Sequence, residues 1–79
     1  MTLLWHSVDI RELDWSPAGN LLASGGMDGA VALWDIESGH LNPSTTLYDL
    51  KGSVAGLKFN PNGTILACQS AEGLIVLWS

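Results

Sequence analysis

The chain repeats itself with a period of 44 residues, and this duplication constrains the fold more than any other feature. Shifted by 44 positions, residues 2–35 align with residues 46–79 without a gap, and ten of the 34 pairs are identical. The identities are Thr2/Thr46, Leu3/Leu47, Leu13/Leu57, Pro17/Pro61, Gly19/Gly63, Leu22/Leu66, Ala23/Ala67, Gly29/Gly73, Leu33/Leu77 and Trp34/Trp78. Self-similarity at such a period is the signature of a repeat architecture, so two equivalent structural units are expected.

Each copy consists of short apolar runs separated by turn residues, which predicts β-strands. The expected strands cover 10–15, 21–24 and 30–34 in the first copy, and 54–59, 65–68 and 74–78 in the second. Turns are expected at 16–20 and 25–29 and at their counterparts, and a linker at 38–44 leads to an outer strand at 45–48. No segment shows the 3.6-residue period of a helix. The prediction is an all-β fold built from four-stranded units.

The spacing of a dozen positions in each copy resembles a WD repeat, the blade unit of a β-propeller. The first copy carries His6, Trp15-Ser16-Pro17, the run 21–26, Asp28-Gly29 and Leu33-Trp34-Asp35. The second copy, 54–78, is similar to the same repeat with more departures. The resemblance covers essentially the whole chain. It implies two four-stranded antiparallel blades per chain.

The resemblance also implies a hydrogen-bonded chain of four side chains in each blade. In the first copy these positions are His6, Ser24, Asp28 and Trp34. Such a connected network satisfies buried polar groups together. In the second copy the corresponding residues are Leu50, Cys68, Glu72 and Trp78. The second blade is therefore expected to depend more on apolar packing and to contain fewer hydrogen bonds.

The order of the expected strands leaves both ends of the chain without partners. With D as the outermost strand, the elements are D at 2–5, A-B-C at 6–35, a linker and D at 36–49, and A-B-C at 50–79. Unpaired strand edges and bare blade faces invite association, so head-to-tail assembly into a ring is expected. Four copies would give eight blades at about 45° each and three would give six at about 60°, against about 51° in the seven-bladed rings usual in the family. The homotetramer is therefore preferred and the homotrimer is second. A fragment of a longer propeller, or an engineered two-blade unit, is the other interpretation.

Composition limits the classes of partner. The 79 residues carry a net charge of −5, and the three basic side chains, Arg11, Lys51 and Lys58, are scattered. Phosphate binding needs clustered basic residues, which argues against nucleic acid and against anionic membranes as partners. No apolar run approaches the roughly 20 residues of a membrane helix, and the N-terminus does not resemble a signal peptide. One cysteine, Cys68, excludes an internal disulfide, and a cytoplasmic location is expected.

No residue pattern predicts catalysis, a metal site or a cofactor. Ser24, His6 and Asp28 have the residue types of a hydrolase triad, but the strand-turn-helix elbow that exposes a nucleophilic serine is missing. His40 has no companion ligand at metal-binding spacing, and an exposed loop histidine is expected. Cys68 takes the place of Ser24 in its repeat, so a buried, unreactive thiol is expected. The pair Gly25-Gly26 precedes no helix that could bind phosphate, which favours a turn.

The function predicted on this basis is that of a non-enzymatic scaffold that binds other proteins or peptides at the propeller rim. In the family this rim is formed by the loops before strand A and between strands B and C. The candidate rim contacts are Asp9, Arg11, Met27, Lys51 and Ala71. The alternative is a purely architectural, minimal propeller unit with no dedicated ligand.

Overall fold

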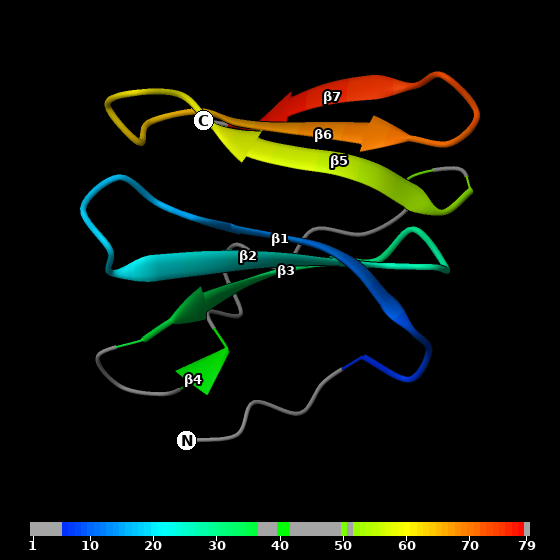
Figure 1. Ribbon diagram of the computed structural model, residues 1–79, viewed down its shortest axis with the longest axis horizontal. Coiled ribbons are helices and arrows are strands. Elements are labelled where there is room, and N and C mark those ends of the chain that lie inside the picture. Colours follow the sequence, from blue (N-terminus) through cyan, green and yellow to red (C-terminus); the bar gives the residue numbers. More distant parts are fainter. Residues whose placement is uncertain (1–5, 37–39, 42–49, 51, 79) are drawn as a thin grey trace.

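Two antiparallel sheets lie one above the other in the computed structural model, which describes residues 6–36, 40–41, 50 and 52–78 (Figure 1). The first sheet has the order β1 (Ile10–Trp15), β2 (Leu21–Gly26), β3 (Val31–Asp35) and β4 (His40–Leu41). The second has the order β5 (Val54–Phe59), β6 (Leu66–Ser70) and β7 (Ile75–Trp78). The all-β prediction is confirmed. Within the described ranges, no helix is long and apolar enough to cross a membrane.

The two sheets follow the sequence repeat closely. β1 and β5 have the predicted bounds, and the strands predicted at 21–24, 30–34, 65–68 and 74–78 are found within two residues of their expected ends. Both copies shift register at the same place, between Ile10 and Glu12 in β1 and between Val54 and Gly56 in β5. A bulge of this kind bends a strand and increases its twist. The repeated sequence therefore encodes repeated irregularities as well as repeated strands.

The predicted turn at 25–29 is wrong at its start, because Gly25 and Gly26 lie in β2. Gly26 pairs with Ile10, and Gly25 pairs with both Glu12 and Val31. Both positions are buried, and other groups fill the space above them. The two glycines are thus explained by close packing against neighbouring groups and not by a turn.

The predicted linker is also wrong in part, because β4 forms within it. His40–Leu41 pairs antiparallel with the end of β3, where Trp34 opposes Leu41 and Asp35 opposes His40. These two residues satisfy backbone groups at the open edge of β3. The sequence predicts instead that a strand at 45–48 pairs there. His40 is therefore in a strand and not in a loop. The outer strands predicted at 2–5 and 45–48 lie outside the described residues.

The hydrophobic core lies between the two sheets. The first sheet contributes Ala23, Val31 and Leu33, and the second contributes Val54, Leu57, Phe59, Leu66 and Cys68, with Leu50 from the connection. β1 runs alongside β5, so the first strands of the two copies are neighbours (Figure 1). This core buries the face that each sheet turns toward the other sheet.

Candidate functional site

The hydroxyl of Ser24 is the centre of a buried polar cluster in the first sheet. Ser24 Oγ lies 2.7 Å from His6 Nε2, and it accepts a hydrogen bond of 2.8 Å from Trp34 Nε1. Ser24 and Trp34 are both buried. The cluster ties the segment before β1 to the middle of β2 and to the end of β3. Three of the four side chains singled out by the sequence are thus joined by hydrogen bonds.

The fourth side chain, Asp28, lies beside this cluster in the turn between β2 and β3. Its Oδ1 atom accepts a hydrogen bond of 3.0 Å from Ala30 N. A Cβ atom placed on Gly26 would be 2.9 Å from Asp28 Oδ1 and 3.1 Å from His6 Nδ1. The absence of a side chain at Gly26 therefore lets the carboxylate and the imidazole approach the same point. Burial lowers the pKa of His6, while the negative charge of Asp28 opposes that shift.

Two of the four equivalent positions in the second copy hold apolar side chains. Leu50 and Cys68 stand where the first copy has His6 and Ser24, and both belong to the buried core. Burial raises the pKa of the Cys68 thiol to about 11. A thiol with this pKa is almost entirely protonated near neutral pH, and the protonated form is not the nucleophile. Trp78, in contrast to buried Trp34, is exposed.

A hydroxyl that the sequence reading missed replaces Asp28 in the second turn. Ser70 Oγ accepts hydrogen bonds of 3.2 Å from Glu72 N and from Leu74 N. Leu74 is the repeat counterpart of Ala30, whose N–H is bound by Asp28 in the first copy. In the aligned repeats, Ser70 stands opposite Gly26 and Glu72 stands opposite Asp28. This paired difference in the sequence could have indicated that a serine hydroxyl replaces the aspartate carboxylate in the second turn.

Three of the candidate rim residues, Asp9, Met27 and Ala71, lie where two loops are joined in the same way in both copies. Met27 N donates a hydrogen bond to Asp9 O (2.9 Å), and Ala71 N donates to Ser53 O (2.8 Å). Asp9, Met27 and Ala71 are exposed at these junctions. Arg11 is also exposed, but it lies in β1 and not in a loop. Lys51 lies outside the described residues.

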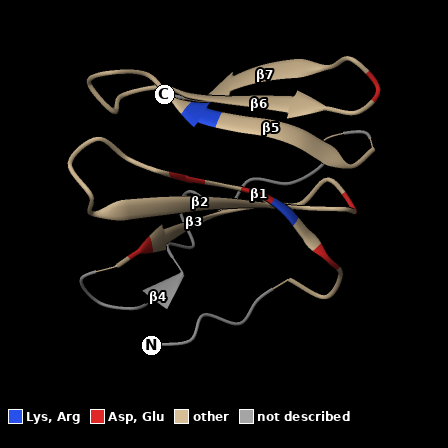
Figure 2. Cartoon of the chain, viewed as in Figure 1, with Lys and Arg blue, Asp and Glu red and all other residues tan. Residues whose placement is uncertain are grey.

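The charged residues among those described lie on strands and loops of both sheets (Figure 2). Arg11 and Lys58 lie on different sheets, so the described part of the chain has no basic cluster. Among the described residues, no group of three or more His, Cys, Asp and Glu could hold a metal ion.

Specific contacts fix the two sheets against each other. Asp14 Oδ2 accepts a hydrogen bond of 2.8 Å from Phe59 N, which joins β1 to β5. Gly29, with a φ of 88°, packs against the carbonyl oxygen of Leu50, where a Cβ atom would collide with that oxygen. Around its counterpart Gly73, with a φ of 87°, none of the described residues places an atom within 4 Å of a Cβ position. The close contact of Gly29 with Leu50 therefore has no counterpart at Gly73 among the described residues.

The outer face of the second sheet is exposed, although the equivalent face of the first sheet is buried. Val31 and Leu33 of β3 are 1% and 9% exposed because the second sheet covers them. Their counterparts in β7, Ile75 and Leu77, are 67% and 66% exposed. We call this surface, formed by Lys58, Ala67, Gln69, Ile75 and Leu77, the leading face.

The first sheet has a complementary uncovered surface. Leu57 and Phe59 of β5 are 8% and 9% exposed because they pack on the first sheet. Their counterparts in β1, Leu13 and Trp15, are 60% and 53% exposed. We call this surface, formed by Ile10, Leu13 and Trp15, the trailing face. The leading and trailing faces thus repeat the two surfaces that meet inside the chain.

Comparison with known proteins assigns the sequence pattern. The family described as "WD domain, G-beta repeat" matches residues 1–35 and again residues 41–79. These two ranges correspond to the two copies found by alignment of the chain with itself.

Curated relatives share this similarity over most of the chain. The mouse F-box-like/WD repeat-containing protein TBL1X is 34% identical over 70 residues, which cover 89% of this chain and 13% of that protein. The small ribosomal subunit protein RACK1 of Medicago sativa is 40% identical over 79 residues, 98% of this chain and 22% of that protein. The corresponding protein of Candida albicans is 41% identical over 71 residues, 87% and 21% respectively. The chain therefore spans between about an eighth and about a fifth of the length of these relatives.

Proposed function

The chain belongs to the WD-repeat family, and from this premise we propose that it is a non-enzymatic propeller unit that associates head to tail with further copies and serves as a scaffold for protein binding. The observation that carries the proposal is the pair of uncovered faces. A repeat unit buries its apolar surface only against a neighbour, and both outer surfaces here expose apolar side chains at positions that are buried in the other copy.

Head-to-tail contact would place the trailing face of one copy on the leading face of another. Equivalent surfaces of the two sheets already pack against each other within the chain. The contact between the sheets is therefore the template for the proposed contact between copies. Such a heterologous contact must close into a ring or continue as a filament. Four copies would form eight blades and three would form six. The tetramer remains the preferred ring because about 45° per blade is nearer than about 60° to the seven-bladed geometry.

Substitution on the leading face tests this association. Leu77→Lys would place an ammonium group in the middle of the proposed contact, and the native mass is expected to fall toward that of a single chain. Leu74→Lys is the matched control, because Leu74 is exposed but its counterpart Ala30 is not part of the core between the sheets. Equal masses for the two variants would contradict the proposed contact.

Protein binding is proposed for the loops that carry Asp9 and Met27. These loops are held together by a backbone hydrogen bond and expose both side chains, so they form one continuous surface. Repetition around a ring would multiply each contact and raise the overall avidity. Capture of partners from a cell extract by wild-type chain, Asp9→Ala and Met27→Ala tests this proposal. Unchanged partners would favour the second candidate, an architectural unit without a dedicated ligand.

The second candidate has support of its own. Because the relatives are much longer, neighbouring sheets could come from the same longer polypeptide and not from further copies. In that case the two faces would be internal blade contacts. The rim residues would then be ordinary solvent-exposed loop residues.

The cluster of His6, Ser24 and Trp34 is proposed to be a structural clasp and not a catalytic site. Ser24 Oγ is engaged by both an imidazole and an indole, and it is buried. His6→Ala is expected to lower the free energy of unfolding by about 1–3 kcal/mol, since the buried Ser24 hydroxyl loses a partner. A hydrolytic activity that this substitution removes without a change in melting would instead indicate catalysis.

A further inference from the structure

At one pair of cross-strand neighbours, the large and the small residue change places between the two copies. In the first sheet Glu12 of β1 opposes Gly25 of β2, whereas in the second sheet Gly56 of β5 opposes Gln69 of β6. Each sheet therefore has one large and one small residue at this place. The large residue is on the first strand in one copy and on the second strand in the other.

The glycine of the first pair is required by the contact between the two sheets. Val54 of β5 lies directly over Gly25. A Cβ atom on Gly25 would be 2.5 Å from Val54 Cγ1 and 2.8 Å from Val54 Cβ. Carbon atoms do not approach so closely, since favourable contact begins at about 3.5 Å. The two sheets can pack at their observed separation only because position 25 has no side chain.

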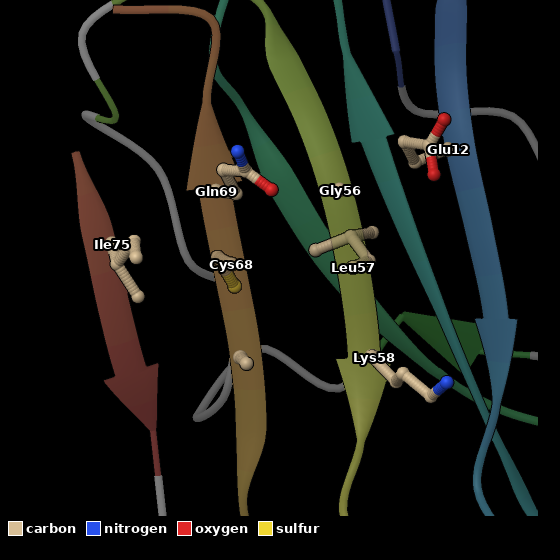
Figure 3. Close-up of a pocket in the computed structure, with 8 residues that line it drawn as sticks. Glu12, Gly56, Leu57, Lys58, Cys68, Gln69 and Ile75 are labelled. Carbon is tan, nitrogen blue, oxygen red and sulfur yellow. The ribbon is translucent and has the colours of Figure 1, made fainter. Parts of the chain in front are cut away.

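The leading face has a side chain at this place. Gln69 is the repeat counterpart of Gly25, and it is exposed. Its side chain leans toward Gly56, where a Cβ atom would be 3.2 Å from Gln69 Oε1. Gln69 and Gly56 both line a hollow of about 320 Å³, together with Lys58, Ile75 and, from the first sheet, Glu12 (Figure 3). A docking copy would bring Ile10, the counterpart of Val54, to the edge of this hollow, and isoleucine is one methylene larger than valine.

The leading face also differs at a second position, on β5, from the equivalent surface of the first sheet. Asp14 binds Phe59 N inside the chain, but its counterpart on the leading face is Lys58. A lysine ammonium has donors and no acceptor, so it cannot bind the N–H of Trp15 that a docking copy would present there. A contact between copies would therefore lack two features of the contact within the chain.

We propose that Gln69 and Lys58 keep the association of copies weak and reversible, with Gln69 as the residue that mainly limits its strength. This inference rests on the head-to-tail association proposed above, and it identifies the partner of the leading face as the trailing face of a second copy. Gln69 must move further over Gly56, or the sheets must separate, before Ile10 can be seated. Either change costs free energy that the inner contact avoids.

A series of substitutions at position 69 tests the proposal, with the dissociation constant of self-association measured by sedimentation equilibrium in about 0.15 M salt, where exposed charges are screened beyond about 8 Å. Affinity is expected to fall in the order Gln69→Gly, Gln69→Ala, wild type, Gln69→Arg. The glycine variant is expected to bind about tenfold or more tightly than wild type, a change of about 1.4 kcal/mol. Addition of Lys58→Asp to Gln69→Gly restores both residues of the inner contact and is expected to tighten association further.

The outcomes separate the two levels of the proposal. Association of wild type with the same dissociation constant in every variant would overturn the role of Gln69 and leave the head-to-tail contact standing. No association of wild type or of any variant would overturn the head-to-tail contact itself. If circular dichroism shows that Gln69→Gly fails to fold, the comparison of Gln69→Ala with Gln69→Arg decides the same question.

Discussion

The carboxylate of Asp14 accepts a hydrogen bond of 2.8 Å from the backbone N–H of Phe59, 45 positions further along the chain. This bond joins the first strand of one repeat to the first strand of the next. It satisfies a backbone donor of β5 on the side away from β6. It also distinguishes the contact within the chain from the contact proposed between chains, because Lys58 occupies the equivalent position on the leading face.

Removal of the Asp14 carboxylate is expected to weaken the packing of the two sheets. Asp14→Ala should lower the free energy of unfolding by about 1.5–3 kcal/mol, the usual contribution of a hydrogen bond to a charged group. Urea denaturation followed by tryptophan fluorescence measures this change. Glu12→Ala, which removes another acid from β1, is the control and is expected to have a much smaller effect. Equal losses for the two variants would show that charge, and not the bond to Phe59, is responsible.

Two glycines with the same backbone conformation provide a matched pair for the contact between the sheets. Gly29→Ala and Gly73→Ala both force alanine into a positive φ, which costs about 1–2 kcal/mol. Only Gly29 packs against the Leu50 carbonyl, so Gly29→Ala should also separate the sheets and lower the melting temperature further. Thermal melts of the two variants measure the difference. Equal melting temperatures would contradict the close approach at Gly29.

Stability is expected to depend on pH through His6. Burial lowers the pKa of His6 in the folded chain below the ordinary value of 6.5, so the unfolded chain binds a proton first as the pH falls. Stability should therefore be complete above about pH 6.5 and decrease as the pH falls from there to the folded-state pKa. Denaturation curves at intervals between pH 7.5 and about pH 5 measure the slope, which should be smaller in His6→Gln. A wild-type slope identical to that of the variant would exclude His6 as the source.

The thiol of Cys68 is expected to be unreactive in the folded chain. Its pKa of about 11 and its complete burial leave little thiolate and no access for a reagent. At pH 8 the native chain should react with a disulfide reagent at least about a hundredfold more slowly than free cysteine. The same reaction in denaturant should proceed at the rate of an exposed thiol, which controls for any intrinsic change. Rapid labelling of the native chain would contradict the burial of Cys68.

Much of the fold follows from the repeated sequence because local patterns determine it. The runs that become β1 and β5 have strand bounds that alternation and turn residues alone define correctly. His6, Ser24 and Trp34 lie far apart in the sequence, but their spacing matches the family pattern, and the sheet brings them together.

The differences from prediction lie where contacts between separate segments of the chain decide the outcome. Gly25 was predicted to lie in a turn because glycine favours turns, but its role depends on Val54, 29 positions away in the other sheet. The pairing of His40–Leu41 with β3 likewise depends on a free strand edge and not on local preference. The bond between Asp14 and Phe59 could not be predicted either, because it depends on how the two repeats pack against each other.

The most direct test of the proposed association is the native mass of the wild-type chain at micromolar concentration and above, by sedimentation or native mass spectrometry. One chain has a mass of 8.4 kDa. The leading and trailing faces predict a concentration-dependent species of four chains, or of three chains as the second choice. A single chain of 8.4 kDa at every concentration would contradict head-to-tail association.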